Sequence, residues 1–214
     1  MSIDFRASSL APRVARALFV GVVLFVLFFV PGTSPARASK TGPAERPASR
    51  WEFLMSSGAF LPVGAQHGTI SSGALSTAQL SYVVRPFMAL SATVGWARSR
   101  DLTTADDSAL DLFSYDIGSE VRTRDLQMSD RITLRSFVGG GIGVRSYDSR
   151  QNGRTSLHAL AAYGSFGGEL GAGRVRLRLD ARDYVTHSKP LGSRGESETR
   201  SELALTAGVR LVSR

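Results

Sequence analysis

Apolar and polar residues alternate along most of this chain. The stretch RVRLRLDARDYV (174–185) shows the pattern clearly: arginine or aspartate occupies nearly every second position, and valine, leucine or alanine lies between them. Successive side chains of a β-strand point to opposite faces, so this period of two predicts a strand with one polar and one apolar face. No stretch after residue 50 has a period of 3.6, so the pattern predicts no helix there.

Eight segments carry this alternation, and turn-forming residues separate them. Each is at least as long as the about 9–11 residues that a tilted strand needs to cross a bilayer. Strands of soluble sheets are mostly about 5–6 residues long. The predicted strands are 51–61, 72–84, 87–99, 110–124, 131–147, 156–170, 174–187 and 201–212.

The predicted connections alternate in length. Short ones (85–86, 125–130 and 171–173) follow the second, fourth and sixth strands, and longer polar ones follow the others. Up-and-down membrane barrels have short periplasmic turns and longer outer loops. An even number of antiparallel strands also closes without a free edge, as a bilayer requires. We therefore predict an all-β fold, an eight-stranded antiparallel up-and-down transmembrane β-barrel over residues 51–214.

The N-terminus has the layout of a secretory signal peptide. Three arginines precede an unbroken apolar run at 17–30, and Ala36 and Ala38 frame a small-residue cleavage site. The run is shorter than the about 20 residues of a membrane-spanning helix. We predict a signal peptide at 1–38, with an uncleaved anchor as the alternative, and a flexible leader at 39–50.

With the apolar face toward lipid, the polar face lines the barrel. Eight strands leave an interior that side chains just fill, and charges buried there must be paired. We predict an ion-pair and hydrogen-bond network that plugs the lumen, with glycines making room for long arginines; the alternative is a simply solvated charged face. The predicted network residues are Glu52, Asp116, Glu120, Arg122, Arg131, Arg135, Arg145, Arg176, Arg178, Asp180, Arg182, Glu202 and Arg210.

Aromatic residues near the strand ends fit the girdles that membrane barrels place at both interfaces. Two positions do not follow the face pattern: Glu169 shares its side of the sixth strand with Leu157 and Tyr163, and Asp183 lies on the outward side of the seventh. The expected girdle residues are Trp51, Phe53, Tyr82 and Phe87 at one end, and Trp96, Phe113, Tyr115, Tyr147 and Tyr184 at the other.

The composition excludes some classes of function. The formal net charge is +8, but most arginines stand singly between apolar residues, as on one face of a strand, so we expect no nucleic-acid partner. The absence of cysteine excludes disulfides and thiol chemistry. His67, His158 and His187 lack the spacing of a metal site. We expect neither a metal nor a cofactor.

Three stretches, FVGGGIGVRSY, RVRLRLDARDYV and SELALTAGVRLV, resemble the small eight-stranded outer-membrane β-barrels related to the OmpA membrane domain and OmpX. The resemblance covers residues 51–212. It implies a monomer exported to the outer membrane of a Gram-negative-type bacterium, inserted by the barrel-assembly machinery and surrounded by outer-membrane lipid. Thr206, Gly208 and Leu211 match the spacing of the family's last strand, although the chain ends in Val-Ser-Arg and not in an aromatic residue.

The long connections at 100–109 and 188–200 are the expected functional surface, with a structural, adhesion or surface-interaction role and no enzymatic activity. One alternative is a soluble, secreted, lipocalin-like barrel with its apolar face around a ligand. Another is a lipid A-modifying hydrolase, whose only candidate residues are His187 and Ser188 with Glu196 or Glu198. Adjacent strand residues point to opposite faces, which argues against the hydrolase.

Overall fold

The computed structural model describes residues 50–63, 68–102, 109–149, 156–188 and 198–213. The predicted signal peptide and all but the last residue of the predicted leader lie outside these ranges and remain predictions. Within the described residues, no helix has the length and hydrophobicity needed to cross a membrane.

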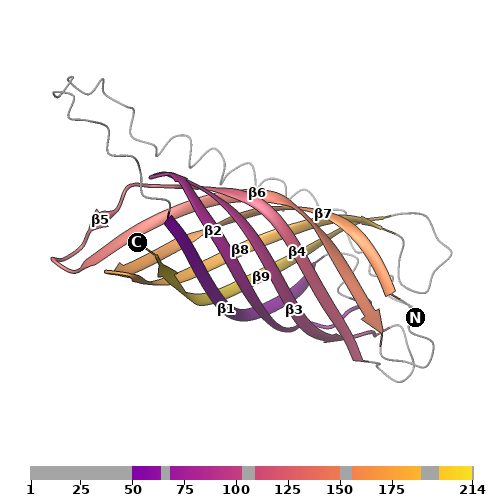
Figure 1. Ribbon diagram of the computed structural model, residues 1–214. Helices are drawn as coiled ribbons and strands as arrows, with labels where there is room; N and C mark the ends of the chain where they lie inside the picture. Colours follow the sequence, from indigo (N-terminus) through magenta and orange to yellow (C-terminus); the bar gives the residue numbers. More distant parts are fainter. Residues whose placement is uncertain (1–49, 64–67, 103–108, 150–155, 189–197, 214) are drawn as a thin grey trace, which may run out of the picture. The chain divides into compact units, whose positions relative to one another are not determined.

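Strands make up nearly all of the described chain (Figure 1). Eight of them are long, 13 to 18 residues each, and match the predicted strands with ends that differ by at most three residues. The ninth, β5, has two residues. The strands are β1 (Arg50–Val63), β2 (Gly73–Arg85), β3 (Met88–Arg100), β4 (Ala109–Arg122), β5 (Leu126–Gln127), β6 (Ile132–Ser149), β7 (Ser156–Ala172), β8 (Val175–Ser188) and β9 (Glu198–Val212).

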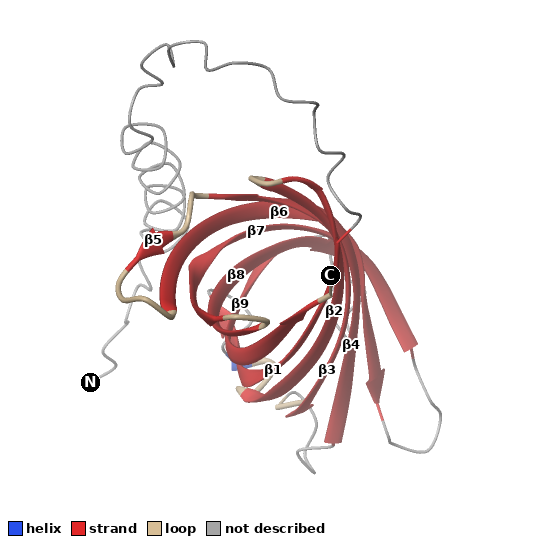
Figure 2. Ribbon diagram, turned by 60° about the vertical axis from the view of Figure 1, so that its left-hand side comes forward, coloured by secondary structure: helices blue, strands red, loops and turns tan. Residues whose placement is uncertain are grey.

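The eight long strands close into a barrel (Figure 2). Each pairs antiparallel with the next along the chain, and β4 pairs directly with β6. The ring closes between the last strand and the first, where Glu52 lies opposite Val212 and Val63 opposite Ser201. Closure leaves no sheet edge among the eight strands, so every backbone ladder in the wall has a partner. The predicted up-and-down barrel is confirmed.

The predicted short connection at 125–130 has the wrong bounds. In the structure the chain between β4 and β6 covers residues 123–131 and contains β5. The chain between β4 and β6 forms a hairpin in which Leu126 lies opposite Leu134 and Gln127 opposite Thr133. Backbone hydrogen bonds from Thr123 N to Ser136 O (2.9 Å) and from Met128 N to Ile132 O (2.9 Å) extend this ladder. We call residues 123–136 the β5 hairpin. It projects from one end of the barrel, outside the closed ring (Figures 1 and 2).

The turns at 86–87 and 173–174 lie at the same end as this hairpin, which we call the hairpin end; the opposite end is the loop end. Ala172 pairs with Val175 across the two-residue turn at 173–174. Gly173 has a φ of 63°, a left-handed conformation that glycine adopts without steric cost. This tight turn fixes the register of β7 against β8, which places Glu169 opposite Arg178.

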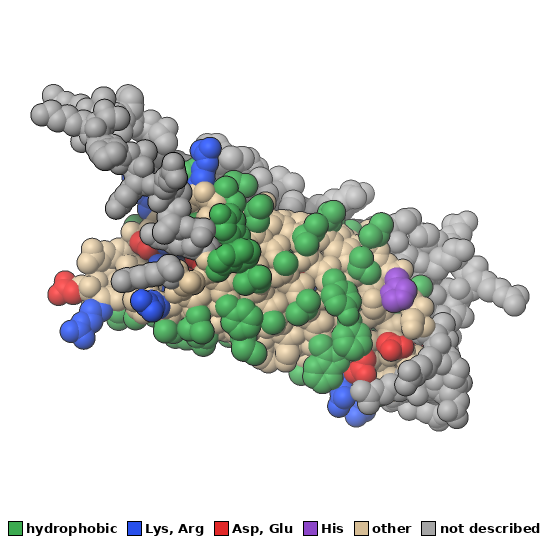
Figure 3. Space-filling view, in the orientation of Figure 1, with side chains coloured by type: hydrophobic (Ala, Val, Ile, Leu, Met, Phe, Trp, Pro, Cys, Tyr) green, Lys and Arg blue, Asp and Glu red, His purple; other side chains and the backbone are tan. Residues whose placement is uncertain are grey.

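The two faces of the wall have opposite character. Large apolar side chains are exposed on the outside, with Leu160 and Leu179 78% and 67% accessible. Figure 3 shows hydrophobic side chains spread over the outer wall and charged ones toward its two ends. Among the described residues, twenty polar or charged ones are buried, and each is 7% accessible or less. This is the reverse of a soluble protein, in which charged residues are rarely buried and large apolar residues usually are.

The predicted aromatic girdles hold only in part. Trp51, Phe53, Phe87, Trp96 and Tyr115 are exposed on the outer wall, and Tyr82 and Phe113 are half-buried. Trp51 and Tyr82 pack together, with ring centroids 5.0 Å apart. The predicted girdle positions of Tyr147 and Tyr184 are wrong, because both side chains are buried inside the barrel. Each lies two residues from an inward-facing arginine and so shares its face.

Candidate functional site

The interior of the barrel contains two layers of side chains. Near the hairpin end lies a group of paired charges that we call the ion-pair cluster, contributed by five strands. Its members are 6% accessible or less. They are Glu52 on β1, Glu120 and Arg122 on β4, Glu169 on β7, Arg178 and Asp180 on β8, and Arg210 on β9.

Arg178 joins three carboxylates. Its Nη1 lies 2.8 Å from Glu169 Oε1, and its Nη2 lies 2.6 Å from Glu120 Oε2 and 3.0 Å from Asp180 Oδ2. The guanidinium also lies over the ring of Phe137, 3.3 Å from the centroid. A buried charge is tolerated where neighbouring groups pair with it, and this arginine has partners on every edge and one face.

Two further arginines complete the cluster. Arg122 binds Glu52 through two nearly parallel hydrogen bonds (2.9 and 2.6 Å), and its Nε donates to Glu120 Oε1 at 2.6 Å. Arg210 Nη1 lies between three carboxylates, 3.1 Å from Glu52, 3.2 Å from Glu120 and 2.9 Å from Glu169. The paired groups come from strands on opposite sides of the ring, so the cluster spans the lumen.

Arg182 links the cluster to the middle of the barrel. Its Nη2 lies 3.4 Å from Asp180 Oδ2 and donates to Gln79 Oε1 at 2.6 Å. Asp116, 3.9 Å from Arg182 Nη1, accepts a hydrogen bond from the Tyr184 hydroxyl at 2.8 Å. Polar pairing therefore continues along the interior instead of ending at the cluster.

Closer to the loop end, Glu202 lies between a cation and a phenol. Arg145 Nε is 3.6 Å from Glu202 Oε2, and the Tyr147 hydroxyl donates to Glu202 Oε1. The Arg145 guanidinium also stacks on the Tyr184 ring, 3.5 Å from its centroid. All of these side chains are almost completely buried.

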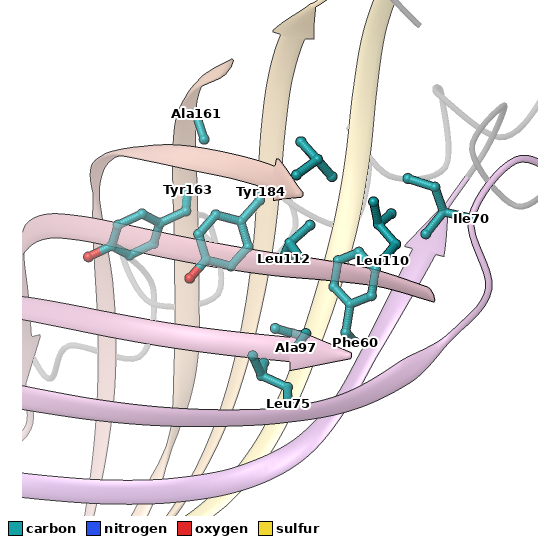
Figure 4. Packing of buried hydrophobic residues seen from close by; sticks show 11 residues of the cluster. Phe60, Ile70, Leu75, Ala97, Leu110, Leu112, Ala161, Tyr163 and Tyr184 are labelled. Carbon is teal, nitrogen blue, oxygen red and sulfur yellow. The ribbon is translucent and has the colours of Figure 1, made fainter. Parts of the chain in front are cut away.

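The second layer, near the loop end, is apolar. Phe60, Ile70, Leu110 and Leu112 are each accessible to 1% or less and pack together across the lumen. Figure 4 shows these side chains converging from several strands, with Tyr163 and Tyr184 beside them. Tyr147 and Tyr184 belong to the same apolar cluster, so it packs directly against the polar groups around Glu202 and Arg145. The alternation pattern did not predict it, because it assigned apolar side chains to lipid.

The predicted residues Arg135 and Arg176 lie apart from the ion-pair cluster, at the mouth of the hairpin end. Both bind Asp125 of the β5 hairpin, at 2.7 and 3.2 Å. Partial burial alone would raise the pKa of Asp125, but hydrogen bonds from the two guanidiniums outweigh it and hold the pKa below its usual range. Arg131, predicted in the lumen network, is exposed in the bend before β6. That prediction extended the strand alternation one residue too far.

The two positions that did not fit the pattern are explained by the register. Glu169, Leu157 and Tyr163 all face inward, and Glu169 is the acidic member of an otherwise apolar or small interior face of β7. Counting back from the tight turn at 173–174 would have placed Glu169 opposite Arg178. Asp183 does face outward, and its Oδ1 accepts a hydrogen bond from Ser201 Oγ at 2.6 Å.

The candidate hydrolase residues belong to the loop end, where β8 ends and β9 begins. His187 and Ser188 end β8, opposite Thr199 and Glu198, and Glu196 lies outside the described residues. His158 is exposed, with its Nδ1 2.8 Å from Ser146 Oγ. The described part of the chain contains no group of three or more histidines and carboxylates placed to hold a metal ion.

No family model matches the chain, and no curated protein matches it. Solved structures do. Neisserial surface protein A aligns with a TM-score of 0.54 at 12% identity, over 76% of this chain and 96% of that protein. The N-terminal β-barrel domain of Pseudomonas aeruginosa OprF aligns at 0.49 and 10% identity, over 78% and 100%. Ail of Yersinia pestis aligns at 0.46 and 11% identity, over 76% and 99%.

The likeness to Neisserial surface protein A agrees with three features of this chain: the closed ring, the eight long strands, and the apolar outside with charges inside. The chain has the fold of the small eight-stranded outer-membrane β-barrels.

Proposed function

We propose that this protein is a monomeric outer-membrane β-barrel whose sealed interior makes it a rigid support for its outer loops. The loops then carry a structural, adhesion or surface-interaction role. The observation that carries the proposal is the inverted wall: apolar side chains outside, and paired charges inside a closed ring. An apolar outer wall of this extent is stable only when lipid or detergent covers it.

The strand lengths support a bilayer as the covering medium. The eight long strands have 13 to 18 residues, which exceeds the about 9–11 needed to cross the hydrocarbon region. Barrel closure satisfies the backbone groups that lipid cannot. The proposal implies export, insertion by a barrel-assembly machinery and contact with outer-membrane lipid.

A channel function is not favoured by the interior. The ion-pair cluster and the apolar cluster occupy successive levels of the lumen, so an ion would have to break buried salt bridges and then cross a hydrophobic layer. The lipocalin-like alternative needs an apolar interior around a ligand. The interior of this barrel is instead filled near the hairpin end by paired charges, among them Arg178, Arg210 and four carboxylates. The loops are therefore the part of the protein left to meet a partner.

Cell fractionation tests the proposal, followed by electrophoresis of the membrane fraction with and without boiling. The expected result is an outer-membrane band whose mobility changes on heating, because closed barrels stay folded in cold detergent. A soluble periplasmic band with no shift would contradict the proposal. Planar-bilayer recording of the purified protein should show no stable conductance step, and a persistent open state would contradict the sealed interior.

The surface role has its own test. Cells that carry the intact protein, or variants with residues 103–107 or 190–196 replaced by a Gly/Ser linker, are compared for attachment to host cells and extracellular matrix. Both variants should keep the heat-dependent mobility shift and lose attachment. Unchanged attachment by the two folded variants together would contradict a role for these loops.

A further inference from the structure

The β5 hairpin has two faces of opposite character. Leu126 lies directly opposite Leu134, so the two side chains are on the same side of the hairpin. Met128 and Ile132 continue that side, and Leu126 and Met128 are 63% and 65% exposed. The opposite side is polar and faces the mouth of the barrel; it consists of Asp125, Gln127, Thr133 and Arg135.

The apolar side of the hairpin continues the outer wall of the barrel. Leu134 lies opposite Leu170 on β7, Leu170 opposite Leu177 on β8, and Leu177 opposite Val209 on β9. All four side chains are exposed and share the outward face. The hairpin therefore extends the surface that the proposed function assigns to lipid, past the ring of eight strands.

Positive charge surrounds this extension. Arg124 and Arg131 flank the hairpin's apolar residues. Arg85, the last residue of β2, and Arg174, in the turn before β8, lie at the same end of the barrel. All four are exposed. Among the described residues of these turns and the hairpin, the acids are Asp130 and Asp125, and the latter is already bound to two arginines.

We propose that the β5 hairpin is a membrane-interface anchor for the periplasmic leaflet. Leu126 and Met128 insert among the acyl chains, and Arg124 and Arg131 bind the phosphates of anionic phospholipids. An apolar face bordered by basic residues is the pattern of segments that lie in the headgroup region. The ion pairs of Asp125 with Arg135 and Arg176 hold the base of the hairpin in the orientation that this requires.

This inference rests on the proposed membrane location, and one set of variants separates the two. The chain has no cysteine, so single-cysteine variants can be labelled cleanly with an environment-sensitive fluorophore. The positions are Leu126, Gln127 and Met128 in the hairpin, and Leu177 on the barrel wall. Each labelled protein is folded into phosphatidylcholine vesicles with or without phosphatidylglycerol and probed with nitroxide-bearing lipid and aqueous iodide.

The expected result is an alternation along the hairpin. Labels at 126 and 128 should lose fluorescence to nitroxide lipid about as much as the label at 177 and be protected from iodide, whereas the label at 127 should be quenched by iodide. If 177 is quenched by lipid but 126 and 128 respond only to iodide, the anchor is wrong and the barrel stands. If 177 also responds only to iodide, the membrane location itself is wrong.

A matched pair of variants tests whether Arg124 and Arg131 bind anionic headgroups. Combining Arg124→Gln with Arg131→Gln should abolish the gain in lipid quenching at position 128 that phosphatidylglycerol produces. Arg98→Gln, an exposed arginine near the loop end, should leave that gain intact. Equal quenching at 128 with and without phosphatidylglycerol in the otherwise unchanged protein would overturn the binding of anionic headgroups. A hairpin covered by a periplasmic protein instead would give iodide-accessible labels at 126 and 128 in these purified vesicles.

Discussion

Glu169 and Arg178 lie directly opposite each other on β7 and β8, and their side chains meet at 2.8 Å inside the barrel. Direct cross-strand pairing gives this contact a fixed backbone geometry. Arg178 then reaches beyond its neighbour to Glu120 on β4. A local pair thus becomes a bridge between strands that are not adjacent in the ring.

Reversing the charge of Arg178 should destabilise the barrel. Arg178→Glu leaves Glu120, Glu169 and Asp180 without this cation and adds a fifth carboxylate to the cluster, and breaking a buried pair typically costs about 3–5 kcal/mol. Urea unfolding in detergent micelles measures the loss. Arg100→Glu, at the exposed end of β3, should change stability by less than about 0.5 kcal/mol. Equal stability of the two variants would contradict the role of the cluster.

Adjacent glycines on β7 should respond differently to a methyl group. A Cβ at Gly167 would lie 2.0 Å from the backbone oxygen of Leu179 and 2.5 Å from Phe137 Cζ, whereas one at Gly168 would have only an ordinary contact, 3.7 Å from the backbone oxygen of Arg135. Gly167→Ala should therefore cost about 1–3 kcal/mol through overpacking, and Gly168→Ala should be nearly neutral. The same unfolding experiment compares them, and the opposite order would show that β7 faces the other way.

The ion pairs of Asp125 with Arg135 and Arg176 should make the stability of the protein fall in acid. The pKa of this carboxyl is lowered from 3.8 in the folded protein, so its stabilising effect is complete above about pH 4 and is lost as pH falls through the lowered value. Because Asp125 is 33% exposed, the effect should reach at most about 1 kcal/mol. Thermal unfolding of the natural protein and Asp125→Asn should differ at pH 7, and the difference should shrink as the pH falls below 3.8 through the lowered pKa. A constant difference across this range would contradict the assignment.

Removing one hydroxyl should test the polar pairing near the loop end. Tyr147→Phe takes away the donor to the buried Glu202 carboxylate, and an unmet buried acceptor costs about 1–3 kcal/mol. Tyr115→Phe removes a hydroxyl from an exposed ring on the outer wall and should change stability by less than about 0.5 kcal/mol. Chemical denaturation in micelles distinguishes the two, and no effect of Tyr147→Phe would indicate that water replaces the phenol.

Much of this architecture follows from period-two alternation. The strands, their order and the inward position of most of the predicted charges need only the rule that neighbouring side chains point to opposite faces. The rule also shows its limits at Arg131 and in the β5 hairpin. There the strands end, and local turn geometry, not membrane burial, determines which way a side chain points.

Other residues of the interior were not predicted from the sequence, for a different reason. Phe60, Leu110 and Leu112 face inward because a narrow barrel needs bulky side chains to fill one level of its lumen, and alternation cannot distinguish an apolar residue meant for lipid from one meant for the interior. Glu169 became visible only through its partner across the tight turn. Asp125 depended on three-dimensional contacts between a connection and two strands.

The ion-pair cluster also constrains how the chain can fold. Glu52 belongs to the first strand and Arg210 to the last, and the two side chains pair with each other. Glu52 also binds Arg122 on β4, and Arg210 binds Glu120 on β4 and Glu169 on β7. Any partial sheet that entered the hydrocarbon region would carry several of these charges without their counterions. Insertion of the strands one hairpin at a time is therefore penalised, and closure of the ring has to accompany the entry of the strands into the bilayer.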